Sequence, residues 1–456
     1  MGRSYSSQKA YVDGEALLKT DRKILGVVFS DKSLCTRCGT CIGACDENAL
    51  VIGKNFYPEI NEDLCTSCGI CEKVCPGGKV DFRELAEITF GDIACDDSFD
   101  GRVLKTFVGF SNDERIRNGG AGGGIITGLL HDLLKRKMVD GCIVTRMNPE
   151  KPYYGEVFVA RTYEELLESQ QSKYIIIPVN AILKEIRNLD GRFAIAALPC
   201  QIHGLRLMEK QKDPVMDKIK LIIGLFCASA MEPVVALEML EMKKINPQDL
   251  KTFNFREGAW PGNIIATLKN GQKVKMHYSN FKDGAINYMT QLYSPFRCQT
   301  CIDGSSEFSD ISISDAWTRD ETGKYIFKSQ SKILVRTEKG LNAINEAMKN
   351  GSITIEDVTR NKDYKTHKLH RKKKGLKAPL RVERLRKKGI QVPEYDRKIE
   401  KYSLRENIEE RLETFIMTIG HYRLFRYPLY KILISKFGVP MIKIRQYNKR
   451  RKYRRR

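Results

Sequence analysis

The chain is organised around two cysteine runs, CTRCGTCIGAC at residues 35–45 and CTSCGICEKVCP at residues 65–76. In both runs the four cysteines are separated by two, two and three residues. At this spacing three neighbouring thiolates can reach one cubane cluster, and the fourth can reach across to an adjacent cluster. The runs contain eight of the chain's 14 cysteines, an arrangement too regular for chance. They therefore predict two 4Fe-4S clusters.

Each predicted cluster takes three ligands from one run and the fourth from the other. The two ligand sets are Cys35, Cys38, Cys41 and Cys75 for one cluster, and Cys65, Cys68, Cys71 and Cys45 for the other. The alternative is a zinc site or a disulfide knot, but zinc ribbons use two separated Cys-x-x-Cys pairs. We expect a bacterial-type ferredoxin fold over residues 30–82.

Length and composition exclude several classes of protein. A chain of 456 residues with ordinary apolar content can bury a core and form two or three domains. The first residues lack the apolar segment of a signal peptide, and no apolar run reaches the roughly 18 residues that a spanning helix needs. Cysteines that an intracellular environment keeps reduced favour metal or redox chemistry over disulfide bonds. We expect a cytoplasmic protein, either free or peripheral on the inner face of the membrane.

Between residues 100 and 355 the sequence alternates between strand and helix patterns. The expected strands are 104–110, 139–147, 154–161, 192–198 and 218–226, and the expected helices are 123–138, one opened by the capping box Thr162-x-x-Glu165, and 178–189. Residues 263–278 are typical of a hairpin that turns at Asn270-Gly271. The alternation predicts an α/β domain with a largely parallel sheet.

A glycine-rich loop, NGGAGGG at residues 118–124, follows the first of these strands. Clusters carry single electrons whereas hydride carriers deliver pairs, so a flavin normally joins the two. The loop lacks the ordinary dinucleotide spacing, but its backbone can approach a phosphate or an isoalloxazine ring at the start of the next helix. The alternative is a flexible surface loop. The candidate flavin-binding glycines are Gly119, Gly120, Gly122, Gly123 and Gly124.

Four further cysteines form a candidate third site, namely Cys200, Cys227, Cys298 and Cys301. The first two each follow a buried strand, at the edge where parallel sheets place their ligands. The last two form a close Cys-x-x-Cys pair. Together they can hold a third 4Fe-4S cluster; the alternative places Cys200 and Cys227 in the core, because free cysteine packs well in apolar sites. We interpret Cys142 as a core residue, and Cys95 has no assigned role.

Several motifs together resemble the beta subunits of coenzyme F-420 hydrogenase and dehydrogenase. They are NGGAGGGIITGLL (118–130), SKY (172–174), ALPCQIHGL (197–205), IGLFC (223–227), FNFREG (253–258), RCQTCIDGSSEFSDISISDAW (297–317) and VRTEKG (335–340). The resemblance extends from about residue 30 to residue 350. Two departures stand out: the loop at 118–124 is richer in glycine than the family pattern, and Gln330 replaces a usual glycine.

The resemblance implies an α/β domain that holds FAD and one 4Fe-4S cluster, with the deazaflavin coenzyme F-420 docking against FAD. It adds four residues to those expected to contact the cofactor, namely Thr127, Lys173, Tyr174 and Gln201. The N-terminal two-cluster segment is then the electron entry or exit, toward a ferredoxin or another redox partner protein.

The resulting prediction is an oxidoreductase in which coenzyme F-420 exchanges a hydride with FAD. Single electrons would pass through the third cluster to the ferredoxin-type clusters, and no protein side chain is expected to act as catalytic acid or base. The alternatives are a related reductase with another substrate, an electron-transfer subunit without a substrate site, and a nucleic-acid binder with structural clusters.

All the excess charge lies in the C-terminal segment, residues 360–456. Residues 361–456 hold 31 Lys and Arg and 9 Asp and Glu, a net charge of +22, whereas the rest of the chain has a net charge of zero. We expect an appendage whose removal leaves the redox core intact. Its interleaved aromatic residues favour contact with an anionic membrane or an acidic partner over nucleic acid or a solvated extension. Residues 426–438 are expected to form a short helix with Pro428 at its start.

Overall fold

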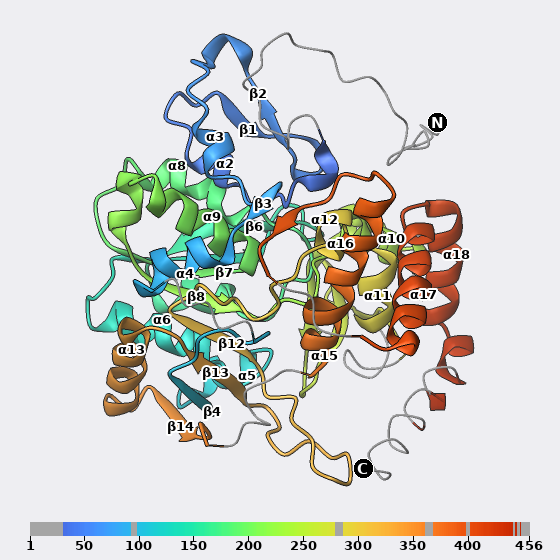
Figure 1. The fold of residues 1–456 in the computed structure, drawn as a ribbon. Helices are drawn as coiled ribbons and strands as arrows, with labels where there is room; N and C mark the ends of the chain where they lie inside the picture. Colours follow the sequence, from blue (N-terminus) through green and yellow to red (C-terminus); the bar gives the residue numbers. More distant parts are fainter. Residues whose placement is uncertain are drawn as a thin grey trace.

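The structure is a computed structural model that describes residues 31–92, 98–278, 286–360, 368–397, 402–440, 443–444 and 447, with the backbone alone at 286–288. Cys95 lies outside the described residues. Figure 1 shows the N-terminal segment at the top, the main sheet and its helices below and to the left, and the C-terminal helices along the right.

An eight-stranded sheet forms the centre of the described chain, in the order β14-β4-β13-β12-β8-β7-β5-β6. In chain order its strands are β4 (Lys105–Ser111), β5 (Gly141–Met147), β6 (Gly155–Ala160), β7 (Phe193–Ala197), β8 (Ile219–Leu225), β12 (Ile311–Asp315), β13 (Ser331–Val335) and β14 (Ile353–Asp357). The four central strands β12, β8, β7 and β5 run parallel. The outer strands pair antiparallel. The α/β class is confirmed, and the predicted parallel pairing holds for the centre of the sheet.

Helices cover both faces of the sheet, because successive side chains of a strand point to opposite faces. They include α4 (Phe82–Phe90), α6 (Ile125–Lys135), α7 (Tyr163–Glu168), α9 (Pro199–Lys210), α10 (Val234–Met242) and α13 (Glu338–Lys349). On one face α6 and α13 pack against Ala194 and Ile223. On the other face α4 and α9 pack against Ile195 and Ile222. Cys142 is fully buried in the first of these two cores, as predicted.

A second, three-stranded antiparallel sheet contains the predicted hairpin. Its strands are β9 (Leu250–Glu257), β10 (Asn263–Leu268) and β11 (Lys273–Lys275). The hairpin turns at Asn270-Gly271 as expected, with the amide of Gly271 donating to the carbonyl of Leu268. Strand β9 matters for the site because it carries Arg256, which reaches the end of β12.

Two predicted helices differ from the structure. Residues 178–189 form a 3-10 turn, η4 (Val179–Ile182), followed by a single helical turn, α8 (Leu183–Ile186). The helix expected at 426–438 begins earlier, as α18 (Arg423–Ile434), and Pro428 lies inside it rather than at its start. Proline removes one helical hydrogen bond at such a position. The helix is retained because Arg426 and Tyr430 anchor it to the body.

The N-terminal segment repeats one local design around its two cysteine runs. In chain order its elements are η1 (Lys32–Leu34), α2 (Thr40–Gly43), β1 (Leu50–Ile52), η2 (Lys54–Phe56), β2 (Pro58–Ile60), η3 (Glu62–Leu64), α3 (Ile70–Lys73) and β3 (Lys79–Val80). Each run begins after a 3-10 turn whose N-cap side chain, Asp31 or Asn61, accepts a backbone hydrogen bond. Gly39 and Gly69 then adopt left-handed backbones before α2 and α3. The same sequence pattern thus produces the same geometry twice.

The N-terminal segment is closely docked on the α/β body. The amide of Asn180 donates to the carbonyl of Cys38 at 3.0 Å. A Cβ at Gly204 on α9 would lie 2.0 Å from Thr40 Oγ1, so a larger residue there would push α2 away. Arg37 forms a bidentate ion pair with Glu232 at 2.6 and 2.8 Å. These contacts fix the first cysteine run against η4 and the segments that follow β7 and β8.

The expectation that the C-terminal segment is an appendage is wrong for its described residues. Its elements are α15 (Lys368–His370), the π-helix η8 (Arg371–Lys377), α16 (Ala378–Lys387), β15 (Glu394–Tyr395), α17 (Leu404–Gly420), α18 and the 3-10 turn η9 (Lys436–Gly438). Strand β15 pairs in parallel with β3, and Tyr430 is fully buried in the main core. Figure 1 shows α16 and α17 beside α11 (Ile286–Leu292) and α12 (Phe296–Gln299). The limits 30–82, 100–355 and 360–456 stay predictions as domain boundaries.

Candidate redox centre

The first predicted set of ligands converges in the structure. The Cys41 thiol interacts electrostatically with Cys38, Cys75 and Cys35, and also with Cys71 of the second predicted set. Backbone amides approach two of the sulfurs: Arg37 N lies 3.4 Å from Cys35 Sγ, and Gly77 N lies 3.3 Å from Cys75 Sγ. Burial raises the pKa of Cys35 to about 11. Thiols so buried become thiolates when a cation takes the place of the proton, which fits a cluster.

The second predicted set lines an apolar pocket between the two runs. All four of its cysteines line the pocket together with Leu50, Ile60 and Ile70. Cys71 interacts with Cys68, Cys45 and Cys65, and burial is the largest cause of its raised pKa. The thirteen described cysteines are all free. Within the described part of the chain, no group of three or more His, Cys, Asp or Glu side chains surrounds a single ion position.

The third candidate set also converges. The Cys200 thiol interacts with Cys298, Cys301 and Cys227, so the four thiols come from three separate segments. Cys200 lies in the first turn of α9, directly after β7, and Cys227 follows β8. Their positions at the carboxyl edge of the parallel strands are those expected from the sequence. Burial raises the pKa of Cys227 to about 12, and the nearby Lys374 acts in the opposite direction.

The first and third sets are neighbours. Cys38 is the first of the thiols that interact with Cys200. Thr40 Oγ1 lies 3.0 Å from Cys38 Sγ, and Asn180 Nδ2 donates both to that hydroxyl and to the carbonyl of Gln201, at 2.9 and 2.8 Å. A continuous path of hydrogen bonds therefore runs from the first cysteine run to the residue after Cys200.

Arg297 lies between these two sets of thiols. It is 4% exposed, and its guanidinium donates to the carbonyls of Pro76 and Gly77 and to Tyr395 Oη. It interacts with Cys35 and Cys75 of the first set. It also interacts with Cys200 and Cys301 of the third. A fixed positive charge is therefore shared by both sites.

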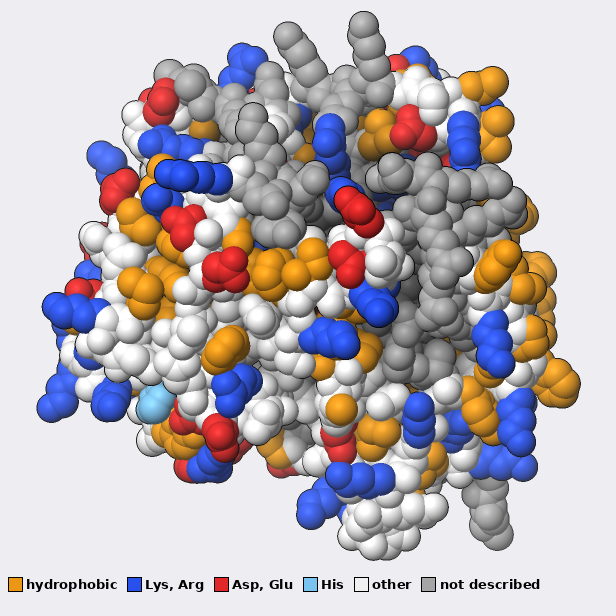
Figure 2. All heavy atoms as spheres, turned by 90° about the horizontal axis from the view of Figure 1, so that it is seen from below, with side chains coloured by type: hydrophobic (Ala, Val, Ile, Leu, Met, Phe, Trp, Pro, Cys, Tyr) orange, Lys and Arg blue, Asp and Glu red, His pale blue; other side chains and the backbone are white. Residues whose placement is uncertain are grey.

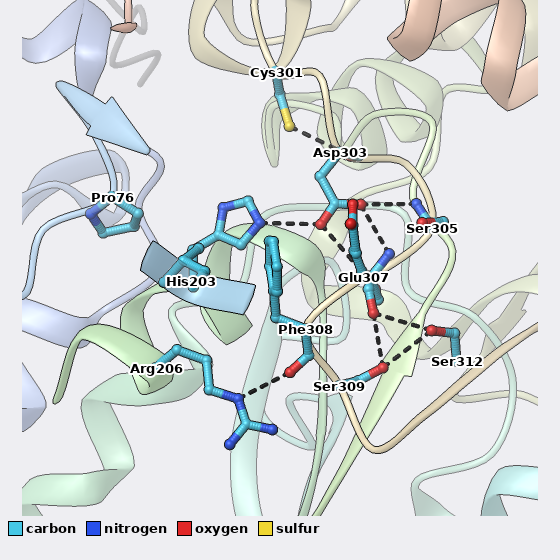
Figure 3. A network of polar contacts seen from close by, with 12 residues as sticks. Pro76, His203, Arg206, Cys301, Asp303, Ser305, Glu307, Phe308, Ser309 and Ser312 are labelled. Carbon is cyan, nitrogen blue, oxygen red and sulfur yellow. Dashed lines mark hydrogen bonds and ion pairs between the residues drawn. The ribbon is translucent and has the colours of Figure 1, made fainter. Parts of the chain in front are cut away.

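A buried polar loop supports the third set (Figure 3). The carboxylate of Asp303 accepts from the amides of Ser305 and Ser306, both at 2.9 Å, and lies 3.0 Å from His203 Nε2. Burial opposes ionisation of Asp303, but His203 and the Ser305 amide lower its pKa to about 2. Because His203 belongs to α9, this contact holds the segment of Cys301 against the helix of Cys200.

The glycine-rich loop lies at the same edge of the sheet. A Cβ at Gly123 would lie 2.4 Å from the carbonyl of Gly109 on β4, and one at Gly122 would lie 2.7 Å from Asp315 Oδ1 at the end of β12. Gly124 has a φ of 74° and is the N-cap of α6. Because glycine has no side chain, the backbone amides of the first turn have no side-chain cap. The free amides of that turn suit an anionic group.

Of the other predicted contacts, Tyr174 lies near the loop and Gln201 does not face it. Tyr174 interacts with Arg256 and Asp315, and Arg256 pairs with Asp315 at 2.6 Å. The Gln201 amide group instead accepts from Leu198 N and donates to the carbonyl of Ile177. It therefore orders the start of α9.

Lys173 is half-buried and Thr127 is buried, both on segments next to the loop. Lys173 Nζ donates to the carbonyls of Gln170 and Gln171 at 2.9 and 3.2 Å, and burial lowers its pKa to about 7. A Cβ at Gly119 would meet Gln170 Oε1 at 2.1 Å, so Lys173 orders the turn against which the loop packs. Thr127 is a buried residue of α6.

An aromatic cluster beside Arg256 was not singled out from the sequence. Both tryptophans of the chain and Tyr325 pack together, with the ring centroids of Trp260 and Trp317 4.9 Å apart. The guanidinium of Arg256 lies 5.5 Å from the Trp317 ring centroid. Two buried polar atoms have no hydrogen-bond partner among the described residues. They are Trp260 Nε1 in this cluster and Gln171 Oε1 in the turn that carries Lys173. Such atoms are the handles by which a pocket orients a ring system.

Family models match most of this architecture. The model for the N-terminal part of the coenzyme F-420 hydrogenase/dehydrogenase beta subunit matches residues 106–184, and the model for its C-terminal part matches residues 190–361. The chain belongs to the family of coenzyme F-420 hydrogenase/dehydrogenase beta subunits. A model of a 4Fe-4S dicluster domain matches residues 34–79. The predicted ferredoxin-type domain in front of the family's α/β body is therefore confirmed.

Curated relatives of this family member include proteins of Methanosarcina mazei and Methanocaldococcus jannaschii. One of the subunits of the F(420)H(2) dehydrogenase of Methanosarcina mazei is 27% identical over 340 residues, 71% of this chain and 90% of that protein. The coenzyme F-420-dependent sulfite reductase of Methanocaldococcus jannaschii is 26% identical over 350 residues, 74% of this chain. This chain spans about half of the reductase, 49% of its length.

A solved structure shares the fold. A chain of the F-420-reducing NiFe hydrogenase complex from Methanosarcina barkeri superposes with a TM-score of 0.50 at 20% identity. The match covers 65% of this chain and 97% of that chain. At this identity the likeness concerns the fold.

Several residues around the third set lie beyond the family match, which ends at residue 361. Lys374 Nζ donates to the carbonyl of Cys298 at 2.8 Å, Arg381 donates to the carbonyl of Gln299 at 2.6 Å, and Tyr395 donates to the carbonyl of Thr300 at 2.9 Å. Sequence reasoning missed all three. The sequence feature that could have pointed to these residues is the high density of Lys and Arg in the C-terminal segment. A solvated tail would have the same composition.

Proposed function

We propose that this family member transfers electrons between coenzyme F-420 and three 4Fe-4S clusters through an FAD held at the glycine-rich loop. The observation that carries the proposal is the succession of sites along one edge of the sheet. The loop follows β4, Asp315 ends β12, Cys227 follows β8 and Cys200 follows β7. Cys200 in turn neighbours Cys38 of the N-terminal domain. Sites in this order can pass electrons one to the next.

The residues around the loop are suited to hold FAD. The uncapped first turn of α6, entered through Gly124, would bind a phosphate. Gly122 and Gly123 let the loop pack against Asp315 and β4. Arg256, fixed by Asp315 and close to the Trp317 ring, would orient the flavin ring. Bound FAD would supply the conversion between a hydride and single electrons.

The deazaflavin coenzyme would dock at the neighbouring aromatic cluster. Trp260, Trp317 and Tyr325 offer rings against which a planar heterocycle can stack, and Trp260 Nε1 is a buried donor without a partner among the described residues. The task of these side chains is to hold two rings together and to exclude water. No acid or base from the protein is needed.

The four cysteines of the third set would hold the cluster between the flavin and the N-terminal domain. Their thiols converge from three segments, the polar loop at Asp303 fixes two of those segments together, and Arg297 offsets negative charge. The eight N-terminal cysteines would hold the other two clusters in the sets given above. The redox partner of those clusters would be a ferredoxin or another protein chain, since the M. barkeri relative is part of a complex.

Metal and flavin analysis of anaerobically prepared protein tests the cofactor content. Three clusters require about twelve irons per chain, together with one FAD. Replacing Cys298→Ser should lower the iron content while leaving the spectrum of the N-terminal clusters unchanged. Cys142→Ser, in the core, is the matched control and should keep all the iron. An iron content that accounts for the N-terminal clusters alone in the unaltered protein would remove the third cluster.

A second function is favoured by one relative, the F-420-dependent sulfite reductase, because a reductase with another substrate would keep the same flavin and clusters. Protein that contains clusters but no flavin would instead indicate an electron-transfer subunit. Reduction of the flavin by reduced F-420 in the absence of any other protein separates the proposed function from the electron-transfer subunit, and oxidation of the reduced protein by sulfite would indicate the reductase.

A further inference from the structure

Helix α17 turns its apolar side chains away from the protein. Leu404, Ile408, Leu412 and Phe415 follow one another at helical spacing, and each is 59% exposed or more. A surface helix of a water-soluble domain normally shows the opposite arrangement. Leu404 and Phe415 are 78% and 62% exposed, so most of their hydrophobic surface is left uncovered by the described chain.

The inward face of α17 is charged. Glu410 is 1% exposed and pairs with Arg381 and Arg384 of α16 at 3.0 and 2.9 Å. Glu413 pairs with Lys377 of the π-helix. Ion pairs, together with the buried Met417 and Gly420, therefore attach α17 to the body, and its outward hydrophobic face is left without a partner among the described residues.

Helix α18 also leaves apolar side chains exposed, although its inward face is mainly apolar, with Tyr430, Leu433 and Ile434 buried in the main core. Its Arg426 points inward and pairs with the buried Glu238 at 2.6 Å. Its Leu424, Phe425 and Ile432 point outward and are 79%, 54% and 51% exposed. The two helices lie side by side at the right-hand edge of the molecule in Figure 1, and Figure 2 shows hydrophobic side chains along the same edge. Two adjacent helices thus share one exposed apolar surface.

The charge on α17 is mixed, because Arg405 and Arg411 share the helix with four Glu residues, but the chain beyond Glu413 carries one sign. Residues 414–456 contain 13 Lys and Arg and no Asp or Glu. Arg423, Lys431 and Lys436 lie on or directly after α18. An amphipathic helix with Leu, Ile and Phe on one side and Lys and Arg beside them has the composition of a segment that lies in the interface of an anionic bilayer.

We propose that α17 and α18 form a docking surface for an anionic lipid bilayer. The apolar side chains of both helices would enter the acyl boundary, and the Lys and Arg residues would contact anionic headgroups. Contact with a second copy of the chain is disfavoured because it would bring two surfaces of net positive charge together. None of the helices in the described part of the chain is long and apolar enough to cross a membrane, so the contact would lie along the surface.

Sedimentation of the intact, cluster-loaded protein with vesicles tests the proposal. We expect it to pellet with vesicles that contain phosphatidylglycerol and to stay in solution with pure phosphatidylcholine. Part of the protein should stay bound in about 1 M salt, where the screening length falls to about 3 Å and a purely ionic contact is lost. Replacing Leu412→Ser and Phe415→Ser together should weaken binding by roughly tenfold or more, because it removes inserted side chains without touching the inward ion pairs.

The matched control replaces two exposed apolar residues elsewhere, Met138→Ser and Met348→Ser, and should bind like the unaltered protein. Absorbance of the clusters and reduction by F-420 should be the same in both variants, which separates this proposal from the redox function. No binding to anionic vesicles, or equal binding by the Leu412/Phe415 variant, would overturn it. So would a dimer, or a complex with nucleic acid, that the same double substitution dissociates.

Discussion

At the scale of single residues, two cationic side chains beside the third cysteine set bear on the redox potential of a cluster there. Arg297 belongs to a motif that resembles the family, whereas Lys374 comes from the segment that follows the family match. Both are almost fully buried, and both act on thiols of this set. A buried positive charge favours the reduced, more negative state of a cluster, because the interior screens charge poorly.

Replacing Lys374→Met should therefore lower the midpoint potential of the third cluster. The methionine keeps most of the buried stem and removes the charge together with the hydrogen bond to the carbonyl of Cys298. We expect a shift on the order of 60 mV, which corresponds to a tenfold change for a one-electron couple. A redox titration followed by EPR measures it. Lys387→Met is the control, since its side chain is 74% exposed and pairs with Glu383; equal potentials in the two variants would contradict the assignment.

His277 gives a pH dependence to the attachment of α18. Its Nε2 accepts from Tyr430 Oη at 2.7 Å. Burial, together with Lys243 and Lys275, lowers the pKa of His277 to about 3 from its usual 6.5. Between these values the unfolded chain binds a proton that the folded protein does not. The free energy of unfolding should therefore fall as the pH drops from about 6.5 toward 3, by about 1.4 kcal/mol per pH unit from this group.

Urea unfolding midpoints at about pH 7, 6 and 5 measure this effect. His277→Gln keeps an acceptor for Tyr430 and cannot be protonated, so the variant should lose less stability than the unaltered protein over this range. Above the usual histidine pKa the stabilities of the variant and the unaltered protein should change with pH in the same way. Identical slopes below that pKa would show that His277 does not carry the dependence.

At the scale of elements, α17 shows what a sequence pattern can and cannot reveal. Its capping box from Ser403 to Glu406 and its helical spacing of apolar residues are readable, but the pattern does not say which face is buried. The buried face includes the charged Glu410 beside Met417 and Gly420, because Arg381 and Arg384 of α16 lie opposite Glu410. The high density of charged residues in the C-terminal segment therefore suggested a solvated tail, although some of these residues form buried ion pairs.

Replacing Glu410→Gln should detach α17 from the body. The change leaves two guanidinium groups, one of them almost fully buried, without their counter-charge, and breaking a buried pair in this way costs about 3–5 kcal/mol. Thermal unfolding should show the loss, and proteases should cleave the C-terminal segment first. Glu383→Gln, which breaks only the exposed pair with Lys387, should leave stability nearly unchanged. Equal effects of the two changes would contradict the buried ion-pair network.

At the scale of the whole molecule, the core of the fold was predictable and the C-terminal segment was not. Strands β7 and β8 were found because strands buried on both faces are apolar throughout. The dicluster domain was recognisable because cluster geometry constrains the spacing of its cysteines. By contrast, the contacts of Lys374, Arg381 and Tyr395 join segments 76 to 95 residues apart. Local patterns carry no signal for pairings of that kind, and the aromatic cluster at Trp260 and Trp317 was missed for the same reason.

The central claim is that electrons pass from coenzyme F-420 to the N-terminal clusters through FAD and the third cluster. Anaerobic mixing with reduced F-420, followed by rapid absorbance and EPR, tests it most directly. The account predicts that F-420 bleaches the flavin faster than NADH does and that the N-terminal clusters are reduced afterwards. In the Cys298→Ser protein the flavin should still be bleached. The N-terminal clusters should be reduced at least about tenfold more slowly than in the unaltered protein. Efficient reduction by NADH or NADPH but not by F-420 would contradict the account.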